Sequence, residues 1–263
     1  MSKGKKIPLS NGRRLVDDVI RIARSQPIAS FYRDVDLSSL DALRKRIKPR
    51  LSWNAIMMKA YALVSREVPE LRQYYRKFPW PHLYEVDDSV AQLTLARQDG
   101  NETRLYFARF RNPDQWSIPQ IQDKIDYFQT APIGDIKQFR HQDRFAALPG
   151  PLRRFLLWML MEVWPTQRPT YMGTFGMTLS GFNQTFAASL LSPNTTSLGV
   201  DPTPRNGIAR VLLTFDHRVL DGKPVIDIIS KLYSTLVGPV KQELETLAAN
   251  MSSGEQSSNS VAA

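Results

Sequence analysis

Cysteine is absent from this sequence of 263 residues, and histidine occurs three times, at His82, His141 and His217. Without thiols the chain can form no disulfide bond, thiolate metal site, iron–sulfur cluster or cysteine nucleophile. A zinc site of three histidines would need all of them to converge from distant parts of the chain. We therefore predict no metal site and expect any chemistry to use oxygen and nitrogen groups.

Long apolar runs are also missing. The most apolar run, Phe155–Met161, ends at Glu162 and is far shorter than the ~20 residues that a membrane-spanning helix needs. Basic residues near Met1 are not followed by the apolar core of a secretory signal. These absences predict a soluble cytoplasmic protein and leave peripheral membrane contact open.

Charge is strongly one-sided, with a formal net charge of +10, and most of the excess lies in residues 1–50. Such a bias attracts nucleic acid, an anionic membrane surface or a small molecule that carries phosphate. No nucleic-acid-binding motif accompanies it, so nucleic acid is not predicted as a partner.

The pattern of apolar residues predicts one core built from helices and strands, which is an α+β fold. Residues 1–11 are predicted to be a basic disordered arm, residues 12–245 one folded domain, and residues 246–263 a disordered serine-rich tail. Residues 74–84 are expected to be irregular, and Asp99-Gly100-Asn101 is expected to form a hairpin turn. The expected helices are 14–23, 40–47, 53–68, 117–128 and 222–237, and the expected strands are 31–37, 90–96, 105–110, 174–179, 185–190 and 208–215.

The segment from Pro149 to Pro165 is unusual because Arg153 and Arg154 precede its apolar run. Apolar runs of this length are usually buried, which predicts a core helix or a helix that covers an oligomer. The alternative is an apolar channel, or a membrane-facing helix, for a long acyl chain or lipid acceptor, with the two arginines at anionic headgroups.

A polar turn with His217 and Asp221, four positions apart, follows the strand expected at 208–215 and precedes a helix. Imidazole is well suited to accept a proton near neutral pH when a partner orients its second nitrogen. A lone histidine in a turn is nevertheless more often structural or merely exposed than catalytic. The spacing alone leaves both interpretations open.

The string His217-Arg218-Val219-Leu220-Asp221-Gly222 resembles the His-Arg-x-x-Asp-Gly signature of the acyltransferase components of 2-oxoacid dehydrogenase complexes. The catalytic domain of that family shares its fold with chloramphenicol acetyltransferase. Residues 51–71 and 173–181 are similar to two further family segments, in the expected order, so the resemblance spans about residues 12–240. It implies a trimeric α+β protein with a central mixed sheet flanked by helices, and it makes residues 12–245 an acyltransferase catalytic domain.

The resemblance also implies roles for single residues. His217 matches the general base that deprotonates the incoming nucleophile, and no acyl-enzyme is implied. Asp221 matches an aspartate that orders the turn through an arginine. Thr178 falls where the family uses a serine hydroxyl to stabilise the oxyanion, on a different subunit from the histidine. Candidates for the arginine are Arg13, Arg14 and Arg21.

Coenzyme A is the implied co-substrate, as acyl-CoA, and no covalent lipoate is expected on this chain because no lipoyl domain precedes the catalytic segment. Three functions therefore stand. The first is a free-standing acyl-CoA-dependent acyltransferase that acts on a thiol, hydroxyl or amine. The second is a dihydrolipoamide acyltransferase core that serves a 2-oxoacid dehydrogenase complex in trans. The third is a non-catalytic trimeric scaffold.

Overall fold

The computed structural model describes residues 4–178, 192–200 and 207–261, with side chains as far as Met251. The strand expected at 185–190, and Leu179 at the end of another, lie outside this range. The helices are α1 (Asn11–Ala23), α2 (Ser38–Arg46), α3 (Trp53–Glu67), α4 (Ile118–Thr130), α5 (Lys137–Ala146), α6 (Gly150–Glu162), α7 (Arg168–Met172), α8 (Gly222–Thr235) and α9 (Lys241–Val261). The strands are β1 (Ile28–Asp36), β2 (Gln73–Arg76), β3 (His82–Glu85), β4 (Val90–Asp99), β5 (Glu102–Arg111), β6 (Phe175–Thr178), β7 (Thr196–Val200) and β8 (Ile208–Asp216).

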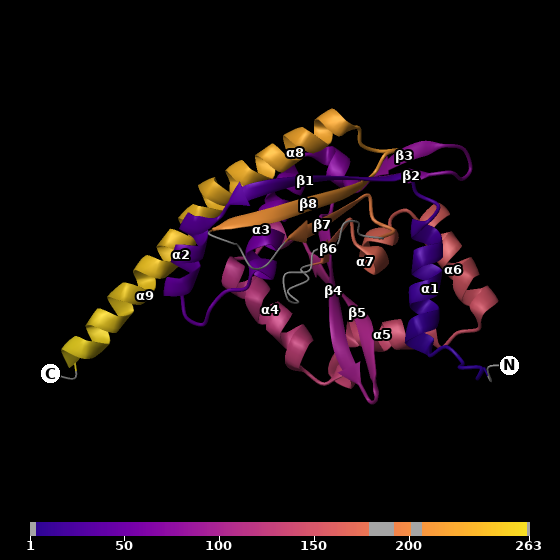
Figure 1. Ribbon diagram of the computed structural model, residues 1–263, viewed down its shortest axis with the longest axis horizontal. Helices are drawn as coiled ribbons and strands as arrows, with labels where there is room; N and C mark the ends of the chain where they lie inside the picture. Colours follow the sequence, from indigo (N-terminus) through magenta and orange to yellow (C-terminus); the bar gives the residue numbers. More distant parts are fainter. Residues whose placement is uncertain (1–3, 179–191, 201–206, 262–263) are drawn as a thin grey trace.

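Among the described residues, six strands form one mixed sheet in the order β1-β8-β7-β6-β4-β5 (Figure 1). Strand β6 pairs in parallel with β4 and β7, and the other neighbours are antiparallel. Helices lie on both sides of this sheet. The structure thus confirms the predicted α+β architecture with a central mixed sheet flanked by helices.

Helix α3 forms the centre of the core, as its spacing of apolar residues predicts. The side chain of Ser52 caps it by accepting a hydrogen bond from the backbone N–H of Ala55 at 3.3 Å. Tyr61 is fully buried, packs edge-on against Phe175 and donates a hydrogen bond to Thr196 Oγ1 at 2.9 Å. These contacts fasten α3 to one face of β6 and β7.

The opposite face of the sheet carries polar side chains at one level across its strands. Successive strands place side chains on alternate faces, so residues that are partners in register share a face. This polar row is Arg109, Gln92, Gly176, Ser197 and Thr214, from β5 to β8. Helices α1, α5 and α7 contact this side, and Figure 1 shows α1 and α6 next to one another at one end of the molecule.

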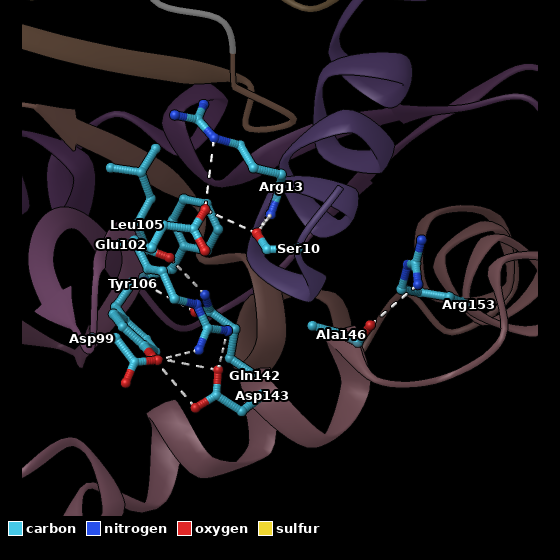
Figure 2. A network of polar contacts seen from close by, with 12 residues as sticks. Ser10, Arg13, Asp99, Glu102, Leu105, Tyr106, Gln142, Asp143, Ala146 and Arg153 are labelled. Carbon is cyan, nitrogen blue, oxygen red and sulfur yellow. Dashed lines mark hydrogen bonds and ion pairs between the residues drawn. The ribbon is translucent and has the colours of Figure 1, made fainter. Parts of the chain in front are cut away.

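A network of ion pairs ties α1 and α5 to the tip of the β4–β5 hairpin (Figure 2). Arg104 bridges Asp99 and Asp143, with its Nη2 2.6 Å from Asp143 Oδ1. Ser10, the N-cap of α1, donates a hydrogen bond to Glu102 at 2.8 Å. Because the contacts of Arg104 with Asp143 and of Ser10 with Glu102 join segments far apart in sequence, the network holds the two helices in place over the hairpin.

Two predicted segments differ from the structure. Residues 74–84, expected to be irregular, include the β2–β3 hairpin, in which Tyr74 and Tyr84 are partners with ring centroids 5.7 Å apart. Pro79 and Pro81 lie in the connection, where they interrupt no strand pairing. Helix α9 continues to Val261, through the serine-rich segment expected to be unfolded. Extending an existing helix costs less than nucleating one.

Arg153 was considered for contact with lipid headgroups, and the structure places it elsewhere. Its guanidinium is buried, pairs with the buried Asp18 of α1 and donates to the carbonyl oxygens of Ala146 and Leu148 at 3.2 and 2.9 Å. Arg154 reaches the other oxygen of Asp18 at 3.0 Å. The pair therefore fastens α6 to α1, and Arg153 is not free for a membrane surface.

Replacing Asp18 by alanine is expected to destabilise the fold by about 3–5 kcal/mol, because Arg153 would remain buried without its counter-ion. Asp17 is a matched control, since its pair with Arg21 is exposed and Asp17→Ala should cost less than about 1 kcal/mol. Urea unfolding of the two variants measures the difference. Equal stability of both would show that the buried pair contributes nothing.

Candidate active site

The turn after β8 positions His217 through main-chain hydrogen bonds. The N–H of His217 donates to the carbonyl of Pro27 at 2.9 Å, and the N–H of Asp216 donates to the carbonyl of Thr195 at 2.8 Å. The N–H of Val219 donates back to Asp216 at 3.0 Å, which closes the turn. Because these bonds use the backbone, the imidazole itself stays available for chemistry.

A buried ion pair beside the histidine was not anticipated from the sequence. Asp216 is 3% exposed and accepts hydrogen bonds from Nε and Nη2 of Arg218 at 2.9 and 2.6 Å. The guanidinium also stacks over Tyr75, 4.4 Å from the ring centroid. The opposite charges of Asp216 and Arg218, on either side of His217 in the sequence, were the signal from which this ion pair could have been predicted. The pair anchors both neighbours of the histidine.

The imidazole of His217 is 51% exposed, with Nδ1 3.4 Å from Oδ1 of Asp221. At that distance Asp221 acts as an electrostatic partner more than as a hydrogen-bond acceptor. In the described part of the chain, Nε2 of His217 has no hydrogen-bond partner, so a ligand can approach it. The arrangement suits a group that gains a proton transiently, since the nearby carboxylate stabilises an imidazolium.

The arginine expected for Asp221 is not found among the described contacts within one chain. Asp221 stands at the N-cap of α8 and is 83% exposed. Arg13 instead lies 3.9 Å from Glu102, and Arg21 lies 3.3 Å from Asp17. The assignment of an arginine to Asp221 therefore stays a prediction.

Thr178 ends β6 on the same sheet face as the polar row, at the wall of a groove of about 260 Å³ under α1. Two buried polar atoms on the groove's lining residues, Oε1 of Gln92 and Oγ of Ser197, lack a hydrogen-bond partner in the described structure. Gly176 lies between them in register, and a Cβ there would approach Ser197 Oγ to 2.6 Å. Unpaired buried polar atoms are costly, so a water molecule or a polar group of a ligand is needed to satisfy these two.

The sheet register separates Thr178 from His217 within one chain. Thr178 is level with Gly199, which is level with Leu212 in β8. His217 lies beyond the other end of β8, roughly 17 Å farther along the strand direction at about 3.3 Å per residue. A single chain therefore does not bring the two predicted groups to one reacting centre.

Within one chain helix α6 is buried on one side only, so its apolar residues do not all fill the core of that chain, and the predicted role of the helix in covering an oligomer stays a prediction. Leu157, Leu160 and Met161 are buried, whereas Phe155 is 55% and Trp158 45% exposed. The apolar run has residues on every side of the helix, so its periodicity could not indicate which side faces inward.

The described residues include no group of three histidine or acidic side chains that could hold a metal ion. Within the same residues, no helix is long and apolar enough to cross a bilayer.

A scan against protein-family models matches none, and a search of curated protein sequences finds no match. Solved structures are similar. A probable dihydrolipoamide acetyltransferase from Listeria monocytogenes 4b F2365 shares 20% identity, with a TM-score of 0.67 over 89% of this chain and 94% of that chain. A truncated catalytic core of the 2-oxoacid dehydrogenase multienzyme complex from Thermoplasma acidophilum shares 18% identity, with a TM-score of 0.66 over 90% and 99%.

A third similar structure is the dihydrolipoamide acetyltransferase of Azotobacter vinelandii, described by the roles of one serine, one histidine and one asparagine in its catalytic mechanism. It shares 15% identity, with a TM-score of 0.65 over 92% of this chain and 94% of that chain. These similarities confirm the predicted fold: the chain has the architecture of the catalytic cores of dihydrolipoamide acetyltransferases.

Proposed function

We propose that this protein is an acyl-CoA-dependent acyltransferase that passes an acyl group directly to a thiol, hydroxyl or amine acceptor. Nε2 of His217 takes the proton of the acceptor as its sulfur, oxygen or nitrogen attacks the thioester carbon. The C–S bond then breaks, and the imidazolium returns the proton to the sulfur of coenzyme A. No acyl-enzyme forms.

The observation that carries this proposal is the exposed imidazole on a rigid turn, in a fold shared with acyltransferase cores. In the Azotobacter vinelandii enzyme the named histidine and asparagine are four positions apart, as His217 and Asp221 are here. Asp221 would stabilise the imidazolium by its charge, and the pair of Asp216 with Arg218 would keep the turn in place. General-base catalysis of this kind contributes roughly 10²–10⁴-fold.

The second part of the proposal is that each site forms between two copies of the chain. Thr178 of one copy would donate a hydrogen bond to the oxyanion formed next to His217 of the neighbouring copy. The long separation of these two residues within one chain supports this arrangement. Thr178 and His217 of one chain would then belong to two different sites, and each site would be completed by a neighbouring copy. The resemblance in sequence favours a homotrimer.

A cationic hollow beside the histidine turn fits the phosphates of coenzyme A. It has a volume of about 210 Å³, and Arg21, Lys77, Arg154 and Arg218 line it. Asp18 and Glu162, the acidic residues of its lining, are already engaged: Asp18 with Arg153, and Glu162 with the N–H groups of Lys77 and Phe78. Arg21, Arg154 and Arg218 also pair with acidic side chains, so a diphosphate would share these guanidinium groups and take a further charge-assisted hydrogen bond from Lys77.

The direct test is to incubate the protein with a panel of acyl-CoAs and acceptors and to follow the release of free thiol. The chain has no cysteine, so a thiol reagent reports coenzyme A without background from the protein. For thiol acceptors the product is itself a thioester and the amount of free thiol does not change, so chromatographic separation of the acylated acceptor from acyl-CoA replaces the reagent. Transfer that requires an added acceptor supports the proposal, and a complete lack of transfer across the panel contradicts it.

A dihydrolipoamide acyltransferase acting in trans is the second candidate, favoured by the similarity to dihydrolipoamide acetyltransferase cores. Dihydrolipoamide belongs in the acceptor panel for this reason. Clear preference for it over hydroxyl and amine acceptors would establish this candidate.

We expect sedimentation equilibrium to give three times the mass of one chain, or a multiple of that value. The reason is that a closed ring of head-to-tail interfaces lets every copy supply one histidine and one threonine to complete sites. Measurement over a wide range of protein concentration separates a stable trimer from weak association. A monomer that is fully active would contradict sites between copies.

A further inference from the structure

An apolar cavity of about 310 Å³ lies between the sheet and helix α6. Leu15 and Val19 of α1 form one wall and Leu156, Leu157 and Leu160 of α6 another. Phe107 and Phe145, from β5 and α5, and Met172 from α7 complete the apolar lining. The buried side of α6 thus faces an open space and is not closed against the core.

Polar contacts hold the walls of this cavity in place, and Gln142, which makes two of them, itself lines the cavity. Gln142 of α5 accepts a hydrogen bond from the N–H of Phe107 at 3.1 Å and donates to the carbonyl of Leu105 at 2.8 Å. The ion pairs of Figure 2 secure α1 and α5 to the hairpin, and Asp18 secures α6 to α1. The cavity is therefore preformed, which lowers the entropic cost of binding.

The cavity adjoins the groove that carries Thr178. Val19, Gln92, Phe107 and Pro193 line both spaces. At this junction lie the unpaired Oε1 of Gln92 and, on the groove side, the unpaired Oγ of Ser197. A groove whose largely apolar wall carries the hydroxyl groups of Thr178 and Ser197 thus continues into an apolar pocket.

Polar atoms at the other border of the cavity belong mainly to Arg109 and His141, which also line a second hollow on the outer side. Burial lowers the pKa of Arg109 to about 10, so its guanidinium stays charged at neutral pH. Its Nη1 donates to the carbonyl of Tyr171 at 3.2 Å. The charged guanidinium thus stands at the border between the cavity and the outer hollow, and the side chains of α1 and α6 that face the space between them are apolar.

We propose that this cavity binds the hydrocarbon chain of the transferred acyl group, about 8–12 carbons long, with the thioester carbonyl in the groove beside Thr178 and Ser197. A cavity of about 150 Å³ holds the six carbons of benzene, so one twice as large fits roughly twelve. The hydroxyl groups in the groove and the apolar cavity match the two ends of such a substrate. This inference rests on the proposed acyl transfer and assigns its substrate class.

Binding tests the pocket apart from catalysis. Acyl-CoAs from acetyl to hexadecanoyl are titrated into the His217→Ala variant by calorimetry. We expect each added methylene to tighten binding about two- to fourfold until the chain reaches about ten carbons, with no further gain beyond that length. Affinity that does not depend on chain length would overturn the proposal, even if the wild-type protein proves to be an acyltransferase.

Filling the cavity gives the second test. Leu156→Trp should weaken binding of decanoyl-CoA at least tenfold and leave acetyl-CoA binding unchanged. Leu152→Trp is the matched control, since Leu152 is exposed on the same helix and does not line the cavity. Val19→Phe fills the space from the opposite wall, should Leu156→Trp fail to fold in thermal melting. Unchanged chain-length profiles in both folded variants would contradict an acyl pocket.

The same experiments distinguish failure of the pocket from failure of the proposed function. Chain-length-dependent binding without transfer to any acceptor would keep the pocket and reject the acyltransferase. Transfer confined to acetyl groups, with flat chain-length binding, would keep the acyltransferase and reject the pocket.

Discussion

Replacing His217 by alanine should lower turnover with the best acyl-CoA and acceptor by about two to four orders of magnitude. The variant loses the group that takes the proton from the acceptor, so the nucleophile must attack in its protonated form. The fold should be unaffected, because the side chain is half exposed and the backbone bond to Pro27 does not depend on it. Steady-state kinetics and thermal melting measure the two quantities.

The control is His82→Ala, which removes a histidine from β3 that does not line the hollow beside the histidine turn. Its ring contacts the carbonyl of Trp80 at 2.7 Å and Arg76 at 3.3 Å, and neither contact belongs to the proposed chemistry. Turnover should stay near the wild-type value. If His217→Ala retains most of its activity on the preferred substrate, the general-base mechanism is wrong.

Thr178→Val should lower turnover by about 10²–10³-fold, because valine removes the hydroxyl that donates to the oxyanion and keeps a similar shape. Thr178→Ser keeps the hydroxyl and should stay active. The strand contributes little to this loss, since Thr178 ends β6 and the backbone pairing with Gly199 is preserved. Kinetics of both variants, with binding of acyl-CoA measured separately, distinguishes a loss of catalysis from a loss of affinity.

Mixing the two inactive variants should restore activity. In a trimer with sites between copies, random exchange at equal amounts places an intact His217 opposite an intact Thr178 at about one quarter of the interfaces. Turnover should then recover to roughly that share of the wild-type value. Mass spectrometry of the intact assembly establishes that subunits have exchanged. No recovery after demonstrated exchange would count against shared sites.

Local patterns in the sequence were sufficient for several elements. The helix at α3 and the hairpin of β4 and β5 followed from apolar spacing and from Asp99-Gly100-Asn101, where Gly100 adopts a positive φ of 59°. The turn that holds His217 and Asp221 was also recognisable, because a strand, a polar turn and a helix start are all local signals. Local hydrogen bonds and side-chain spacing decide such features within a few residues.

Contacts between residues far apart in the sequence could not be predicted from local patterns. Asp18 and Arg153 are ordinary charged residues in the sequence, and only the packing of α6 on α1 buries them together. The sequence also did not determine which side of α6 faces the core, because a helix that is apolar on all sides has no single apolar face. Local patterns did not predict the second hairpin because two prolines argue against strands, whereas both lie in the connection between β2 and β3 and leave the pairing of Tyr74 with Tyr84 intact.

By itself, then, the sequence determined the α+β class, the main buried helix and the turn with its histidine, since each depends on periodicity or on a short motif. The tertiary structure alone decided that Thr178 is level with the middle of β8 whereas His217 follows its end, and that the space under α6 is a cavity joined to the Thr178 groove. The physical reason is that strand order and register are properties of long-range pairing. The side chains that meet across the sheet are far apart along the chain, and no local pattern encodes the distance between them.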